Sequence, residues 1–150
     1  MRVVLDSSVL SDLLNPKAKA ASTRQIQAWG LRLLERGEEF WIPGICDYEV
    51  RRKLCHLKSG KSLGRLNEAR RDWEFLPVSQ EHLDAAAEMW ADLRLAGKVT
   101  AADAALDGDV ILCAQARDLA GRPGDPVVVA TTNVKHLIHL VDARLPAAIP

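Results

Sequence analysis

The chain has 150 residues, of which 48% are hydrophobic and 27% charged, and its 20 basic and 20 acidic side chains give a formal net charge of zero. This length and composition fit one globular domain over residues 1–150 that can bury a core without disulfide bonds. No stretch approaches the roughly 20 apolar residues of a membrane span, and the N-terminus lacks the apolar core of a signal peptide, so we expect a cytoplasmic protein with no membrane contact.

Segments that favour strands alternate with segments that favour helices along the whole chain. Short apolar runs predict strands at residues 3–5, 40–42, 75–78 and 127–130. Amphipathic or alanine-rich patterns predict helices at residues 7–15, 22–37, 46–58, 63–73, 79–96 and 100–120, the last of which Gly108 could interrupt. The alternation of helices with fully apolar strands predicts an α/β fold in which helices cover both faces of a parallel sheet.

Asp6 directly follows the first predicted strand. The carboxyl ends of the strands in an open α/β sheet face the ligand crevice, so a carboxylate at this position suits an active site. Aspartate is also a preferred N-cap, and the helix that begins just after it would accept one. Taken alone, Asp6 fits both interpretations, and the choice depends on whether other acids converge on it.

Polar residues also occur where the other strands end. Thr131 and Asn133 follow the fourth strand, and Glu49 lies in the first turns of the helix after the second strand. Asp109, with Asp107 two residues before it, begins the most apolar part of the last long helix. A helix cap, a charge favoured by the helix dipole or an i,i+3 ion pair would explain these acids structurally, whereas their shared edge of the sheet favours a site.

Charged residues are segregated along the chain. Residues 51–71 contain eight Lys or Arg and one acid, a charge of +7, whereas residues 81–109 contain seven acids and two basic residues, a charge of −5. A basic segment beside an acidic tract suits a surface that binds a polyanion next to a cation site. The two segments also fit the solvated faces of ordinary helices.

Convergent acids would require a counterion. Two carboxylates about 4 Å apart repel by about 4 kcal/mol at an effective dielectric constant of about 20. A cluster of three would therefore retain protons with raised pKa values or bind a divalent cation. Oxygen ligands without thiolate or imidazole favour Mg²⁺ or Mn²⁺ over zinc, and such an ion can activate water for attack on a phosphodiester.

Four short motifs occur in order along the chain, at residues 6–8 (DSS), 48–52 (YEVRR), 109–116 (DVILCAQA) and 131–133 (TTN). In order and spacing they resemble the motifs of PIN-domain ribonucleases, and the whole chain resembles a stand-alone domain of the VapC toxin type. The resemblance implies a three-layer α/β/α sandwich with a central, mostly parallel sheet. It also implies Mg²⁺ or Mn²⁺ held by three or four acids, endonucleolytic cleavage of RNA, a small antitoxin protein as partner and, commonly, a homodimer.

The resemblance assigns the catalytic acids residue by residue. Its three core acids fall on Asp6, Glu49 and Asp109, and Asp107 is an additional candidate. We expect Asp6 and Asp109 to bind the metal. Glu49 and Asp107 would position other ligands or the attacking water.

The resemblance also assigns supporting groups. Ser8 and Thr131 match hydroxyl positions that orient the acids. Asn133 stands where many relatives have a fourth acid, and because it brings no charge it puts a second metal ion in doubt. The basic residues expected to contact the RNA backbone are Arg51, Arg52 and Lys53.

The histidines, cysteines and tryptophans could take part in a site, but the sequence also offers structural explanations for them. His136 and His139 lie three apart on a predicted helix, but no acid or cysteine accompanies them at metal-binding spacing. The cysteines form no C-x-x-C pair, and we expect Cys46, Cys55 and Cys113 to be small buried side chains. Core packing or a dimer surface is favoured over base stacking for the tryptophans at 29, 41, 73 and 90.

Three alternative functions fit parts of this pattern. An RNA-processing PIN nuclease without a toxin role would carry the same acids. A non-catalytic PIN-like module would bind RNA or a protein, although all three core acids are present. A phosphatase that uses Asp6 as nucleophile would need a second acid two residues on, where this chain has Ser8. The sequence therefore favours a metal-dependent endoribonuclease that is the toxin of a toxin–antitoxin pair.

Overall fold

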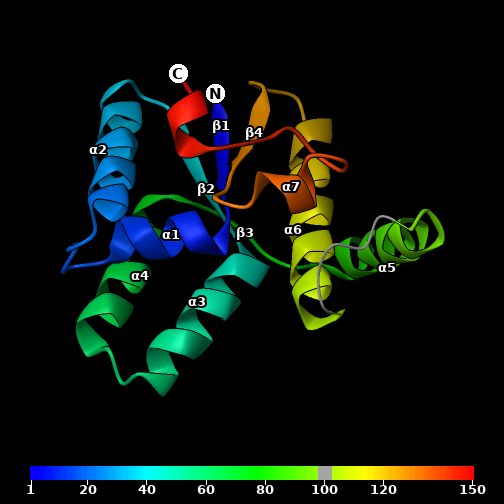
Figure 1. Cartoon of the computed structure of the whole chain (residues 1–150). Coiled ribbons are helices and arrows are strands. Elements are labelled where there is room, and N and C mark those ends of the chain that lie inside the picture. Colours follow the sequence, from blue (N-terminus) through cyan, green and yellow to red (C-terminus); the bar gives the residue numbers. More distant parts are fainter. Residues whose placement is uncertain (98–102) are drawn as a thin grey trace.

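The computed structural model of the chain describes residues 1–97 and 103–150, and its centre is a five-stranded sheet whose strands pair in parallel (Figure 1). The strand order is β3-β2-β1-β4-β5. The strands are β1 (Arg2–Leu5), β2 (Glu39–Pro43), β3 (Glu74–Leu76), β4 (Val127–Ala130) and β5 (Ala143–Arg144). The structure confirms the four predicted strands to within two residues and adds β5 at the edge of the sheet.

The helices also follow the predicted order. They are α1 (Ser7–Leu14), α2 (Ala21–Glu35), α3 (Gly44–His56), α4 (Gly60–Asp72), α5 (Gln80–Leu95), α6 (Asp103–Gly121), α7 (Val134–Leu137) and a 3₁₀ helix at Pro146–Ala148. The predicted start of the long helix at residue 100 lies outside the described residues, and α6 continues through Gly108 without a break. None of the helices in the described part of the chain is long and apolar enough to cross a membrane.

The helices cover both faces of the sheet, as the alternating pattern predicts. Figure 1 shows α2 on one side of the strands and α6, with α5 beyond it, on the other side. The hairpin of α3 and α4 lies next to α1, below the strands in this view. The fold is an α/β sandwich, and the helices that follow β1, β2 and β4 all begin at the same edge of the sheet.

The central pair of strands brings two polar residues side by side. Residues 3–5 of β1 have no exposed surface, because neighbouring strands and helices cover them on all sides. Burial of each such side chain contributes about 1.5–3 kcal/mol relative to an exposed one. Leu5 is in register with Ala130 of β4, so the next residues, Asp6 and Thr131, leave the sheet at the same height.

Aromatic rings fill the core under α2. Trp29 is 3% exposed and stacks on Phe40 with 5.9 Å between ring centroids, and Phe40 packs edge-on against Trp73 at 5.1 Å. Trp90 is half-buried, and the guanidinium of Arg94 lies 4.7 Å from its ring centroid. Core packing therefore accounts for Trp29 and Trp73, as the sequence predicts.

The start of α5 is held by the capping residue that the sequence indicates. Ser79 Oγ accepts a hydrogen bond from the backbone N–H of His82 at 3.3 Å, and His82 Nδ1 accepts one from the backbone N–H of Ser79 at 3.0 Å. His82 Nε2 lies 3.2 Å from Asp118 Oδ2 on α6. The cap therefore also joins α5 to α6.

One expectation about the cysteines is wrong. Cys46 and Cys113 are buried, but Cys55 is exposed. Cys46 and Cys55 are separated by about two and a half turns of α3, at 3.6 residues per turn. They therefore lie on opposite faces of that helix, and only one of the two can face the core.

Candidate active site

Asp6 does not act as a helix cap, although it occupies the N-cap position of α1. Its side chain makes no capping hydrogen bond to the backbone. Instead Oδ2 accepts hydrogen bonds from Ser8 Oγ at 2.9 Å and Thr131 Oγ1 at 2.7 Å, while Ser7 Oγ lies 3.3 Å from Oδ1. The hydroxyls therefore hold the carboxylate in one orientation, and the structural alternative raised for Asp6 does not apply.

Thr131 connects Asp6 to the segment after β4. The side chain is fully buried, and Oγ1 accepts a hydrogen bond from the backbone N–H of Asn133 at 2.9 Å while donating to Asp6. The side chain of Asn133 is exposed and its Nδ2 lies 2.9 Å from His136 Nδ1. Between residues 131 and 133, Thr131 therefore contacts Asp6, whereas the side chain of Asn133 contacts His136.

Glu49 reaches the same region from α3 by lying against Gly108 of α6. A β-carbon placed on Gly108 would collide with Glu49 Oε1. The Glu49 carboxylate therefore occupies the space beside Gly108, and α6 continues through this glycine without a break. Because Asp109 is the next residue, two acids from different helices meet here.

Asp109 carries the electrostatic evidence that the acids converge. Burial raises its pKa to about 6, the charges of Asp6 and Glu49 act in the same direction, and a hydrogen bond with His136 opposes the change. The pKa of the Cys46 thiol is also raised, first by burial and then by the charges of Asp6 and Glu49. The charges of Asp6 and Glu49 therefore both reach Asp109 near the carboxyl edge of the sheet.

The arrangement of the strands and helices agrees with comparisons to known proteins. The sequence profile of the PIN domain family matches residues 3–131. The chain belongs to the PIN domain family. Its fold is similar to that in the crystal structure of VapBC2 from Rickettsia felis bound to a DNA fragment from their promoter, with a TM-score of 0.69 and 16% sequence identity over 97% of both chains. No curated protein sequence matches it.

The donor set of this PIN domain fits a hard divalent cation. Asp6, Glu49 and Asp109 offer carboxylate oxygens, and the pKa of Asp109 is raised first by burial and then by the charges of Asp6 and Glu49, a cost that a cation would offset. Within residues 1–97 and 103–150, no three acidic, histidine or cysteine side chains are already close enough together to hold an ion. Binding of a cation would therefore require these carboxylates to turn toward it, and the cation would offset the repulsion between them.

Asp107 lies apart from the other acids of the PIN domain. Residues two apart on a helix point about 200° away from each other, so Asp107 and Asp109 face opposite sides of α6. Asp107 is exposed and lines a shallow groove of about 350 Å³ between α5 and α6, together with Trp90 and Ile111. The structure does not bring Asp107 to the carboxylate cluster.

The basic residues at the start of the positive segment have different surroundings. Arg51 donates two hydrogen bonds of 2.9 Å to the buried carboxylate of Asp47 and a third, also of 2.9 Å, to Asn67. Arg52 is exposed and lies over the ring of Tyr48. Three of the five N–H donors of Arg51 are therefore used within the protein, where they link α3 to α4.

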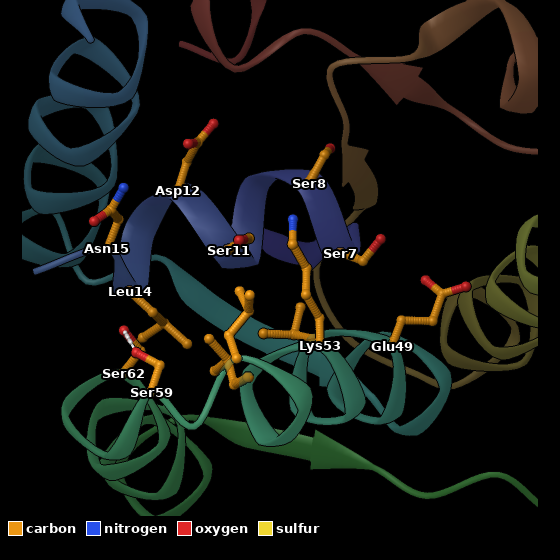
Figure 2. Close-up of a pocket in the computed structure, with 13 residues that line it drawn as sticks. Ser7, Ser8, Ser11, Asp12, Leu14, Asn15, Glu49, Lys53, Ser59 and Ser62 are labelled. Atoms are coloured by element: carbon orange, nitrogen blue, oxygen red, sulfur yellow. Dashed lines mark hydrogen bonds between the residues drawn. The ribbon is translucent and has the colours of Figure 1, made fainter. Parts of the chain in front are cut away.

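Lys53 faces a polar cleft that begins at the carboxylate cluster. Figure 2 shows the side chain of Lys53 extending from α3 toward α1, with Glu49 and Ser7 at one end of the cleft and Ser59 at the other. The cleft has a volume of about 520 Å³. Its lining is formed by residues 7, 8, 11, 12, 14, 15, 49, 50, 53, 54, 57, 59 and 62. The lining combines serine hydroxyls and the Lys53 ammonium with two carboxylates and four apolar side chains, and the cleft reaches the acids at Glu49.

Gln115 is a buried polar residue that the sequence analysis did not single out. It has no exposed surface, and its Nε2 donates to the carbonyl of Leu76 at 2.6 Å while Oε1 accepts from the N–H of Ile45 at 3.4 Å. It therefore joins α6 to the end of β3 and to the start of α3, the helix that carries Glu49. A single glutamine within the apolar run 110–116 is the signal that identifies it.

Gln115→Leu should destabilise the protein by about 1–3 kcal/mol, because the carbonyl of Leu76 would be left buried without a donor. Urea unfolding followed by circular dichroism measures the change. Gln80→Leu is the matched control, since Gln80 is exposed at the start of α5 and pairs only with Asp84. Equal stabilities for the two variants would contradict a structural role for Gln115.

Proposed function

We propose that this PIN domain is a divalent-metal-dependent endoribonuclease and the toxin of a toxin–antitoxin pair. The observation that supports the catalytic part is the convergence of Asp6, Glu49 and Asp109 at the carboxyl edge of the sheet, together with the raised pKa of Asp109. A carboxylate cluster with this much uncompensated charge is expensive for stability and is explained by a site for a cation.

The residues divide into ligands and orienting groups. Asp6 and Asp109 would hold Mg²⁺ or Mn²⁺, with Glu49 placed to orient a further ligand or the attacking water. When bound, such an ion supplies Lewis-acid stabilisation of the phosphate and lowers the pKa of water. Ser8 and Thr131 fix one oxygen of Asp6, so the other oxygen keeps a constant direction. Water would then attack phosphorus, and one P–O bond of the RNA backbone would break.

Cleavage of RNA by the purified protein is the direct test. We expect endonucleolytic cleavage of a mixed RNA pool in the presence of Mg²⁺ or Mn²⁺ and no cleavage in the presence of EDTA. Cleavage that continues in EDTA would contradict metal dependence. If no RNA is cut with either metal, calorimetric titration with metal decides whether the domain is a non-catalytic module, which should take up no metal through its acids.

The polar cleft suggests the path of the RNA strand. Its serines and the Lys53 ammonium offer donors to phosphate oxygens, and it begins at Glu49. Arg52 is exposed one residue away, so it is a second candidate for a phosphate contact. Arg51 is left out of this proposal because Asp47 and Asn67 occupy three of its five donors and Asp47 neutralises its charge.

Lys53→Gln should lower the affinity for RNA and make that affinity less dependent on salt concentration. Loss of one contact to single-stranded RNA lowers the slope of log affinity against log salt by about 0.7. Fluorescence anisotropy in EDTA measures both quantities without cleavage. Arg32→Gln is the control, because Arg32 is exposed on α2 and lies outside the residues that line the cleft. An unchanged slope for Lys53→Gln would argue against the proposed path.

The toxin role is supported by the likeness to the VapBC2 structure, which contains a toxin–antitoxin complex. We expect a small antitoxin protein encoded next to this chain, and a homodimer in solution. Expression of the chain alone should arrest growth, and co-expression of the neighbouring open reading frame should relieve the arrest. Absence of arrest with an active nuclease would favour the alternative role in RNA processing. Light scattering tests the homodimer.

A further inference from the structure

His136 lies directly against one of the acids of the carboxylate cluster. It belongs to the short helix α7, which follows β4, and its Nδ1 is 3.2 Å from Asp109 Oδ2. The side chain is 24% exposed, as is that of Asp109, so both face the partly open end of the cluster. The next residue, Leu137, is 1% exposed and packs in the core, which anchors α7. The imidazole is therefore held beside the cluster by the fold.

The separation of these two atoms suits two ligands of the same ion. Ligands at about 2.1–2.2 Å from an octahedral ion and at right angles to each other lie about 3.0 Å apart. The distance from Asp109 Oδ2 to His136 Nδ1 is 3.2 Å. The two atoms are therefore spaced as two neighbouring ligands of one ion would be.

The ring nitrogen that faces Asp109 can present a lone pair. Nδ1 lies 3.2 Å from the Asp109 carboxylate and 2.9 Å from Nδ2 of Asn133. In the tautomer with the proton on Nε2, Nδ1 accepts from the Asn133 amide and its lone pair is available to a cation, whereas in the other tautomer it donates to Asp109. The side chain of Asn133 is exposed, so it can turn away and leave the lone pair to a cation. Asn133 brings no charge to the cluster, and His136 is the neighbouring group that offers a ligand atom.

We propose that His136 is a nitrogen ligand of the metal site and that it shifts the preference of the site from Mg²⁺ toward Mn²⁺. The proposal rests on the metal dependence proposed above. Mg²⁺ takes oxygen ligands almost exclusively, whereas the affinity of first-row transition ions increases when an imidazole replaces water. A site with carboxylates alone would not make this distinction to the same degree.

Electron spin-echo envelope modulation of bound Mn²⁺ tests directly whether His136 is a ligand, and it does not require RNA cleavage. The wild-type protein loaded with one equivalent of Mn²⁺ should show coupling to ¹⁴N, and the coupling should change to that of ¹⁵N when histidine is labelled. His136→Ala and His136→Gln should both abolish it. His139→Gln is the matched control, because His139 is exposed three residues along and should leave the coupling unchanged.

Calorimetry gives the second readout. His136→Gln should weaken Mn²⁺ binding about tenfold and change Mg²⁺ binding much less, since a nitrogen ligand contributes mainly to the transition ion. Mn²⁺ that binds without nitrogen coupling would overturn the role of His136 and leave the nuclease proposal standing. Failure to bind either ion would overturn both. Nitrogen coupling in a protein that cuts no RNA would support His136 as ligand and contradict the nuclease.

Discussion

Asp6→Asn should lower metal-dependent RNA cleavage about a hundredfold or more. The substitution keeps the size of the side chain and one oxygen acceptor for the hydroxyls of Ser8 and Thr131, so we expect the fold to be retained. It removes one negative charge from the cluster and one anionic ligand oxygen. Binding of Mg²⁺ should weaken in parallel, because the two remaining carboxylates, Glu49 and Asp109, attract a cation less strongly.

Initial rates of cleavage of a labelled RNA, measured at several Mg²⁺ concentrations, test this expectation. Glu88→Gln is the control, since Glu88 is an exposed acid on α5 and its loss changes the net charge by the same amount. Circular dichroism establishes that both variants are folded. Cleavage by Asp6→Asn at the rate of the wild type would contradict the assignment of Asp6 as a ligand.

Asp109→Asn should stabilise the metal-free protein at neutral pH while removing its cleavage activity. The pKa of Asp109 is raised to about 6 in the folded state from 3.8, mainly by burial. Between these two values the folded state binds more protons than the unfolded state, so stability falls as pH rises. Above pH 6 the loss is complete, at about 2–3 kcal/mol for this shift. An uncharged asparagine does not incur this loss.

Urea unfolding in EDTA at pH 5 and pH 8 measures the effect. The wild type should lose more stability than Asp109→Asn between the two pH values, and the difference between the two proteins isolates the contribution of Asp109 from other titrating groups. Addition of Mg²⁺ at pH 8 should stabilise the wild type and leave the variant nearly unchanged. The same pH dependence in both proteins would contradict a strained carboxylate at this position.

The main features of the fold are predictable because they depend on local patterns. The apolar side chains at residues 3–5 and 127–130 are removed from water only in a sheet that helices cover on both sides. Capping residues such as Ser79 define where helices begin. The edge strand β5 is two residues long and has no apolar run. It exists because its backbone pairs with β4, a contact that no local pattern records.

The candidate site was predictable to the extent that parallel strands share a carboxyl edge. That rule places Asp6 and Thr131 together, and the hydrogen bond between them follows from the register of β1 and β4. The face of a helix that packs on the sheet, which decides where its side chains point, does not follow from this rule. Asp107 and Asp109 differ by two residues in sequence, yet only Asp109 reaches the cluster, because α6 packs one face on the sheet and turns the other toward α5.

The sequence by itself determined the order of strands and helices, the acids available at the sheet edge and the type of cation that they suit. Only the tertiary structure decided that Glu49 lies against Gly108, that Arg51 donates to Asn67 of α4 and that His136 faces Asp109. These contacts join residues from 16 to 59 positions apart. They depend on how helices pack against one another, which is decided by the shape of the assembled core and not by the residues that flank each position in the chain.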